Sequence, residues 1–141
     1  MNLLLDTDVL SLLRRQDRHP ELVQWLRNCQ SHTLFLSVVS IGEVERGIEK
    51  QRRSDPNFAR DLTVWLETLL SHFDRQILPI TVPIARRWGQ LSAKLHHTGA
   101  DLLIAATALE HDLVVVTRNT RHFTPTGVKC LDPLAASFPL S

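Results

Sequence analysis

Four polar side chains each lie beside a short apolar segment of the kind that forms a buried strand or helix. In chain order they are Asp6, Glu43, Asp101 and Asn119. In an open parallel sheet the carboxyl ends of the strands share one edge, and functional groups gather beyond that edge. Acidic side chains placed there can bind a hard divalent cation through oxygen. The pattern therefore predicts a metal-dependent enzyme that acts on phosphate esters.

Asp6 is the strongest single candidate because it directly follows the apolar run Leu3–Leu5. A carboxylate in that position would lie at the carboxyl edge of a sheet. Asp6 could instead make a turn or cap the next helix, but Asp8 is better placed to be the N-cap. We therefore assign function to Asp6 and a structural role to Asp8, with support of a metal site as the alternative for Asp8.

Glu43 and Asp101 each have a structural alternative. Residues 40–43 read Ser-Ile-Gly-Glu, a capping box in which the glutamate bonds back to the start of its own helix. Both interpretations of Glu43 stay open, and both place it near the strand ends. Asp101 can cap the apolar helix predicted over 102–109. A charge beside such a segment is costly unless it is capped or paired, so we favour a functional role that can coexist with capping.

Asn119 ends the segment Thr117-Arg118-Asn119, which leaves an apolar strand and enters a loop. Asparagine is a common turn residue, so the turn interpretation is favoured when Asn119 is taken alone. Arg118 and Arg121 can either reach a phosphate or simply be solvated.

Alternating apolar runs and helical stripes predict the elements that position these residues. We expect strands at 2–5, 33–37, 77–80 and 113–117, with a possible edge strand at 128–131. Helices are expected to begin near Asp8, Pro20 and Ser40, and to run over 58–73, 84–97 (with Gly99 as the C-terminal cap) and 102–109. The prediction is an α/β domain spanning 1–141, with a central parallel sheet of four to five short strands flanked by helices.

Composition excludes several classes. The net charge of +1, from 16 basic and 15 acidic residues, does not fit a protein that holds nucleic acid mainly by charge. No zinc, P-loop or nucleophilic-serine motif is present. Cys29 and Cys130 are far apart and are expected to be buried free thiols, and Trp25, Trp65 and Trp88 to be core residues. No apolar stretch is long enough to span a membrane and no signal peptide is seen, so we expect a cytoplasmic protein.

With these motifs in this order, the chain resembles the PIN-domain proteins, and specifically the VapC-type toxin ribonucleases of type II toxin–antitoxin systems. The resemblance rests on LLDTDVL at 4–10, SVVSIGEVERG at 37–47, DLLIAATA at 101–108, the strand at 113–116 with Thr117-Arg118-Asn119, and Phe123. Each motif alone is weak, whereas all of them in this order and spacing are specific.

The resemblance implies a compact α/β/α fold and an endoribonuclease that depends on Mg²⁺ or Mn²⁺. It implies cleavage of structured RNA, often transfer or ribosomal RNA, which stops translation. A cognate antitoxin, VapB-like or of another class, would hold the toxin in check. Promoter DNA would be bound only through the toxin–antitoxin complex, a homodimer is expected, and no membrane is involved.

The family's catalytic positions map onto Asp6, Glu43, Asp101 and Asn119, the three acids being the metal ligands. Two features depart from the family pattern. His122 stands where an acidic residue is common, which puts a second metal position in doubt. The segment between 97 and Asp101 is shorter than in many members, which puts the local geometry of Asp101 in doubt.

Two other functions compete. Asp6-Thr7-Asp8 after a strand is similar to the D-x-D of haloacid-dehalogenase-like phosphatases, but the supporting lysine and later acidic pair of that family are missing. The second is a PIN-fold binding module that acts through antitoxin and promoter-DNA complexes with little nuclease activity. Metal-dependent RNA cleavage without antitoxin separates this module from the nuclease.

Overall fold

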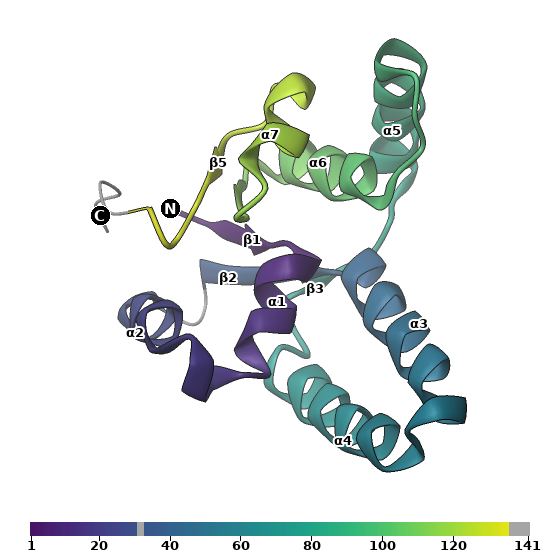
Figure 1. Ribbon diagram of the computed structural model, residues 1–141. Coiled ribbons are helices and arrows are strands. Elements are labelled where there is room, and N and C mark those ends of the chain that lie inside the picture. The colour runs from purple at the N-terminus through teal and green to yellow at the C-terminus, as the bar shows by residue number, and fades with distance from the viewer. Residues whose placement is uncertain (31–32, 136–141) are drawn as a thin grey trace.

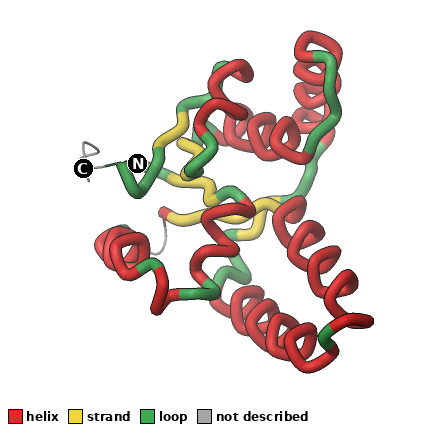
Figure 2. The backbone as a smooth tube through the Cα atoms, in the orientation of Figure 1, coloured by secondary structure: helices red, strands yellow, loops and turns green. Residues whose placement is uncertain are grey.

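A single sheet of short parallel strands forms the centre of the molecule (Figures 1 and 2). The computed structural model describes residues 1–30 and 33–135. Across the sheet the strand order is β3-β2-β1-β4-β5, and every neighbouring pair is parallel. The strands are β1 (Leu3–Leu5), β2 (Leu34–Ser37), β3 (Ile77–Leu78), β4 (Val114–Val116) and β5 (Cys130–Leu131). The predicted α/β class and edge position of the last strand are confirmed.

The strands are apolar on both faces because helices cover both faces, as parallel sheets require. Alternate residues of β1 point to opposite sides. Leu3 and Leu5 belong to one core, whereas Leu4 belongs to the other. Leu4 pairs in register with Phe35 and Val115, which both pack on its side of the sheet. Strand β1 therefore lies at the centre of the sheet and contributes side chains to both cores.

Helices form a layer on each side of the sheet, as Figure 1 shows. One layer holds α1 (Thr7–Leu13), α2 (Pro20–Asn28), α3 (Val38–Ser54) and α4 (Pro56–His72); the other holds α5 (Val82–Leu95), α6 (Ala100–His111) and α7 (Thr120–Phe123). The helices α3 and α4 form a hairpin that turns at Asp55, whose side chain caps α4 by accepting from Phe58 N at 3.1 Å.

Two predicted N-caps are wrong, by two residues and by three residues. Asp6, and not Asp8, is the N-cap of α1, and Ser37, and not Ser40, is the N-cap of α3. Both caps directly follow or end a strand and have extended backbone angles, which is the geometry an N-cap needs. The helices therefore begin as soon as β1 and β2 end, without the short connections that the sequence suggested.

The predicted cap at Gly99 is also wrong. Helix α5 ends at Leu95, and His96 adopts the left-handed conformation with φ of 61°. Histidine is one of the residues that tolerate this region. Gly99, at φ of −60°, is instead the N-cap of α6. The chain thus turns three residues earlier than expected, which leaves a four-residue connection between the two helices.

Trp25 is a core residue as predicted, whereas Trp65 and Trp88 are half-buried at the margins of the two cores. Cys29 and Cys130 are free, as predicted, but half-buried rather than buried. Within residues 1–30 and 33–135, no helix has the length and apolar character needed to span a membrane.

Candidate active site

The carboxyl edge of the sheet holds a pocket of about 300 Å³. Its lining residues come from α1 and the residue before it, from α3, from the first turn of α6, and from the short helix α7 and the residue before it. All four predicted site residues line it: Asp6, Glu43, Asp101 and Asn119. Thr7, Asp8, Ser11, His122 and Phe123 complete the lining. The structure thus brings together side chains that lie more than a hundred positions apart in the chain, while their chemical roles stay predictions.

Asp6 is the buried acid of the pocket, with only 4% of its surface exposed. Its backbone N–H continues the ladder of β1 by donating to Val116 O at 3.1 Å. Its Oδ1 accepts from Val9 N at 2.8 Å, and the carboxylate also accepts from the Thr117 hydroxyl. Asp6 therefore caps α1 and faces the pocket at once, so the expectation that Asp8 would free Asp6 from capping is wrong.

Burial raises the pKa of Asp6 from 3.8 to about 6. Desolvation is the largest cause, and the negative charges of Asp8 and Asp101 add to it. The hydrogen bonds from Thr117 and Val9 oppose the rise but do not cancel it. At neutral pH the pocket therefore holds a costly buried negative charge, and a cation bound beside it would lower that cost.

Glu43 is the sixth residue of α3 and lies beyond its first turn. It cannot reach the backbone N–H groups at the helix start, so the capping-box alternative is wrong. Its Oε1 instead accepts from the Thr7 hydroxyl, which also lies 2.9 Å from the buried Ser40 Oγ. This chain of oxygens fixes the first turn of α1 against α3 and aims Glu43 toward the pocket.

Asp101 is the second residue of α6, two places beyond the N-cap Gly99. The capping alternative for Asp101 is therefore wrong, although an acid in the first turn still interacts favourably with the helix dipole. Its Oδ2 lies 3.2 Å from His122 Nδ1 of α7. The short connection before α6 still delivers Asp101 to the pocket, and His122 contacts it directly.

Asn119 immediately precedes α7 and is exposed, and its side chain makes no capping hydrogen bond. Its backbone N–H donates to Thr117 Oγ1 at 2.9 Å. Thr117 is fully buried and donates in turn to Asp6. Thr117 therefore connects the backbone of Asn119 to the carboxylate of Asp6, which leaves the Asn119 amide available to the pocket.

Asp8, which lines the pocket, forms a two-pronged ion pair with Arg118. Arg118 Nε donates to Asp8 Oδ2 at 2.9 Å, and Arg118 Nη2 donates to Asp8 Oδ1 at 2.7 Å. This geometry is the strong, directional form of an arginine–carboxylate contact. Arg118 is therefore paired with a carboxylate, rather than simply solvated or directed toward a phosphate. The pair ties the loop after β4 to the first turn of α1.

Three residues of the site were not predicted from the sequence: Thr7, Thr117 and His122. Thr7 directly follows the predicted acid Asp6, and Thr117 begins the segment that carries Asn119. A threonine at the end of a buried strand could have indicated such a role, because a buried hydroxyl needs a hydrogen-bond partner. His122 drew notice only as a departure from a pattern.

The donor set fits a magnesium-like cation better than a metal that needs a closed cage. Among the described side chains, no three His, Cys, Asp or Glu residues form a group tight enough to hold a metal ion. Mg²⁺ usually takes one or two carboxylates and keeps several waters. A pocket of about 300 Å³ with oxygen-rich walls and a buried acid of raised pKa suits that mode.

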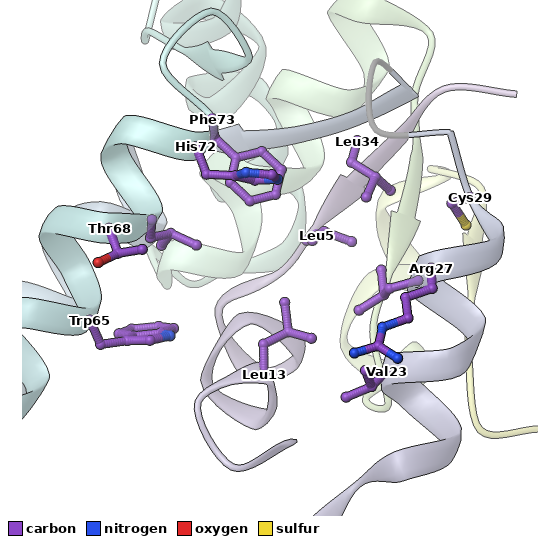
Figure 3. A pocket seen from close by; sticks show the side chains of 12 residues that line it. Leu5, Leu13, Val23, Arg27, Cys29, Leu34, Trp65, Thr68, His72 and Phe73 are labelled. Atoms are coloured by element: carbon purple, nitrogen blue, oxygen red, sulfur yellow. The ribbon is translucent and has the colours of Figure 1, made fainter. Parts of the chain in front are cut away.

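A second and larger pocket, of about 550 Å³, lies between α2 and α4 (Figure 3). Leu5 and Leu34 of the sheet lie at its back, Leu13 of α1 below, and Val23 and Trp65 face each other across it. Its lining is mainly apolar and carries no carboxylate. This pocket suits the apolar side chains of a partner rather than chemistry on a phosphate.

Comparisons with known proteins agree with this architecture. Residues 3–127 match the family model described as PIN domain. The chain is 32% identical to Toxin FitB of Neisseria gonorrhoeae, over 93% of this chain and 97% of that protein. It is 36% identical to Ribonuclease VapC14 of Mycobacterium tuberculosis, over 62% of this chain and 77% of that protein.

Solved structures resemble the fold closely. FitAB bound to an IR36 DNA fragment superposes with a TM-score of 0.82 at 30% identity, covering 96% of this chain and 98% of that one. A toxin–antitoxin complex from Klebsiella pneumoniae superposes with a TM-score of 0.70 at 28% identity, covering 94% and 98%. The phosphatase alternative finds no support here. By its sequence, its sheet and the pocket at its carboxyl edge, the chain belongs to the PIN domain family.

Proposed function

We propose that the chain is a divalent-metal-dependent endoribonuclease and the toxin of a type II toxin–antitoxin pair. The observation that carries the proposal is the convergence of Asp6, Glu43, Asp101 and Asn119 on one oxygen-lined pocket, where burial raises the pKa of Asp6 to about 6. The names of the relatives FitB, a toxin, and VapC14, a ribonuclease, support it. The free thiols are compatible with the cytoplasm, where we propose that the protein acts.

Asp6 and Asp101 would hold Mg²⁺ or Mn²⁺, with Glu43 as a further ligand or as the group that orients water. When bound, the cation supplies positive charge that stabilises the phosphate and makes a water easier to deprotonate. Glu43 is exposed at the pocket and can take the proton of the attacking water. The Asn119 amide can donate to a phosphate oxygen or hold the water in place.

The reaction that follows is hydrolysis. The water oxygen bonds to the scissile phosphorus, the bond from phosphorus to the 3′ oxygen breaks, and that oxygen takes a proton. One fragment ends in a 5′-phosphate and the other in a 3′-hydroxyl. This outcome differs from cleavage by the neighbouring 2′-hydroxyl, which would leave a 2′,3′-cyclic phosphate.

The testing experiment is digestion of total cellular RNA by the purified, antitoxin-free chain, in Mg²⁺, in Mn²⁺ and in EDTA. Discrete fragments are expected with metal and none with EDTA, since the clustered acids of the pocket need a cation to work together. Sequencing adaptors that require a 5′-phosphate should ligate to the new ends. Cyclic phosphate ends would refute the hydrolytic scheme, and a folded protein without metal-dependent cleavage would favour the binding-module alternative.

We also propose a cognate antitoxin partner, with promoter DNA reached only through the complex. The titles of the similar structures, a toxin–antitoxin complex and FitAB on DNA, support both statements. The small net charge of +1 offers little attraction for DNA by the chain alone. Homodimer formation and the class of the antitoxin stay predictions.

The apolar pocket between α2 and α4 is the expected docking place of the antitoxin. Changing Val23 to glutamate places a charge in that pocket and should weaken antitoxin binding at least about tenfold. Cleavage of RNA by free toxin should be unchanged, because Val23 lies outside the acidic pocket. Titration with co-expressed, purified antitoxin measures the effect.

The matched control is Val64→Glu on the outer face of α4. Val64 is 63% exposed and lines none of the pockets described here, so the same charge should leave antitoxin affinity within about twofold. Equal affinities of the two variants would place the docking surface elsewhere.

A further inference from the structure

A groove of about 220 Å³ leads away from the acidic pocket between α1, α3 and α4. Thr7, Ser11 and Glu43 line both the groove and the pocket, so the two adjoin each other. Thr7, Ser11 and Arg14 follow one face of α1 at helical spacing, and Gly47 and Gln51 follow one face of α3. The groove therefore runs along α1 from the acids at its start to Arg14 at its end.

Arg14 is the cation of this groove. Its guanidinium carbon lies 4.9 Å from the centre of the Phe58 ring, which holds the group half-buried against α4. Within residues 1–30 and 33–135, no carboxylate lies at ion-pair distance from Arg14. Burial lowers the pKa of Arg14, and the charges of Arg15 and Arg18 lower it further. A positive charge is thus held in place without an anion to offset it.

An arginine in this setting contrasts with Arg52, Arg87 and Arg118, each of which is paired with a carboxylate. The aromatic contact fixes the plane of the Arg14 guanidinium and leaves its edge N–H groups for hydrogen bonding. Such a group matches the two free oxygens of a phosphodiester. Seven residues of helix separate Thr7 from Arg14, which is about 10 Å along the axis and within reach of the next nucleotides of a strand.

The shape of the groove supports an extended ligand. Gly47 is a glycine in the interior of α3, where alanine would be favoured by about 1 kcal/mol. A Cβ added at Gly47 would meet no atom within 4 Å, so the glycine leaves open space at the groove wall. Gln51, one turn further along α3, adds an amide that can donate to a sugar or phosphate oxygen.

We propose that this groove is a subsite for the RNA strand flanking the scissile bond, with Arg14 contacting a backbone phosphate. The proposal rests on the proposed nuclease function, because it assigns the substrate's path to the acidic pocket. The acids of the pocket repel the phosphates of an RNA strand. A cation beside them, such as Arg14, would offset this repulsion and hold the strand. Arg14 is the half-buried cation that the groove provides.

The experiment measures binding and cleavage separately. Binding of a fluorescent, mixed-sequence single-stranded oligoribonucleotide is followed by anisotropy over a series of salt concentrations, in EDTA, so that no cleavage occurs. Arg14→Gln should weaken binding about tenfold and reduce the salt slope by about 0.7, the share of one phosphate contact in a single strand. In Mg²⁺ the same variant should raise KM with kcat changed less than about twofold.

Arg15→Gln is the matched control, since it removes the same charge from the neighbouring position that does not line the groove. A second pair needs no change at Arg14: Gly47→Glu should weaken binding several-fold more than Gly47→Gln, because the two differ only in charge. Arg14→Lys should recover part of the affinity. Thermal unfolding of each variant shows that the fold is kept.

The outcomes are separable. If Arg14→Gln and Arg15→Gln behave alike, or if the wild-type chain does not bind the oligoribonucleotide, the subsite is refuted even where RNA is cleaved. If Arg14→Gln weakens only antitoxin binding, the groove belongs to the antitoxin and the subsite is again refuted. Arg14-dependent binding without metal-dependent cleavage would support the subsite and refute the nuclease proposal.

Discussion

Replacing Asp6 with asparagine will abolish metal-dependent RNA cleavage and at the same time stabilise the fold at neutral pH. Cleavage should fall by at least about 100-fold, because the amide lacks the negative charge with which Asp6 would hold a cation in the pocket. The amide oxygen can still accept from Val9 N and cap α1, so folding is kept. Fragment yield from total RNA in Mg²⁺, per mole of protein, is the measurement.

The gain in stability follows from the raised pKa of Asp6. In the unfolded chain this carboxyl has a pKa near 3.8, and in the folded chain the value is about 6. The folded state therefore binds more protons than the unfolded state between these values. The contribution of Asp6 to the free energy of unfolding is fully present below pH 3.8 and is lost as pH rises through about 6. The loss amounts to at most about 3 kcal/mol, since one pKa unit is about 1.4 kcal/mol.

Asparagine removes this titration. In EDTA, the free energy of urea unfolding of wild type should fall from pH 4 to pH 7 relative to that of Asp6→Asn. Mg²⁺ should restore the stability that wild type loses at pH 7 and should stabilise the variant less, because a ligand that binds the folded state stabilises it. Equal pH profiles for the two proteins would show that Asp6 titrates normally, and a fully active Asp6→Asn would remove it from the site.

Replacing Phe123 with alanine will destabilise the protein by about 3–5 kcal/mol, the usual cost of removing a fully buried aromatic ring. Phe123 is 1% exposed and packs in the core with Leu4 and Val115 beneath α7. It also lines the acidic pocket, next to His122. Since whole domains are stable by only about 5–15 kcal/mol, this single change should lower the urea midpoint strongly.

Two controls separate packing from other effects. Phe123→Leu keeps most of the apolar volume and should cost less than about 1.5 kcal/mol. Arg121→Ala changes an exposed residue of the same helix and should stay within about 0.5 kcal/mol of wild type. An alanine variant at 123 that unfolds at the same urea concentration as Arg121→Ala would show that the ring does not support the pocket.

The architecture of the domain, and the edge of the sheet at which the pocket lies, follow from local patterns in the chain. Runs such as Leu3–Leu5 and Val114–Val116 are apolar on both faces, which only a strand covered on both sides satisfies. A polar residue that follows such a strand must lie at its carboxyl end. That local rule was enough to place Asp6 and Asn119. Glu43 was placed by the strand that precedes its helix, and Asp101 by the apolar helix that it opens.

Helix starts were less predictable because several residues compete for one cap. Asp6 and Asp8 are both good caps, as are Ser37 and Ser40, and propensity alone cannot choose between them. The choice depends on where the strand leaves the sheet, which is set by the hydrogen bonds of its neighbours. The bond from Asp6 N to Val116 O extends β1 to the residue that then caps α1.

The contacts and charges inside the pocket, in contrast, arise only when the elements pack together. The ion pair of Asp8 and Arg118 joins residues 110 positions apart, and the bond from Thr7 to Glu43 spans 36. The raised pKa of Asp6 comes from burial by elements that its own segment does not encode. Sequence patterns report neighbours within a few residues, whereas burial, charge and pairing arise from surfaces that meet only after the chain has packed.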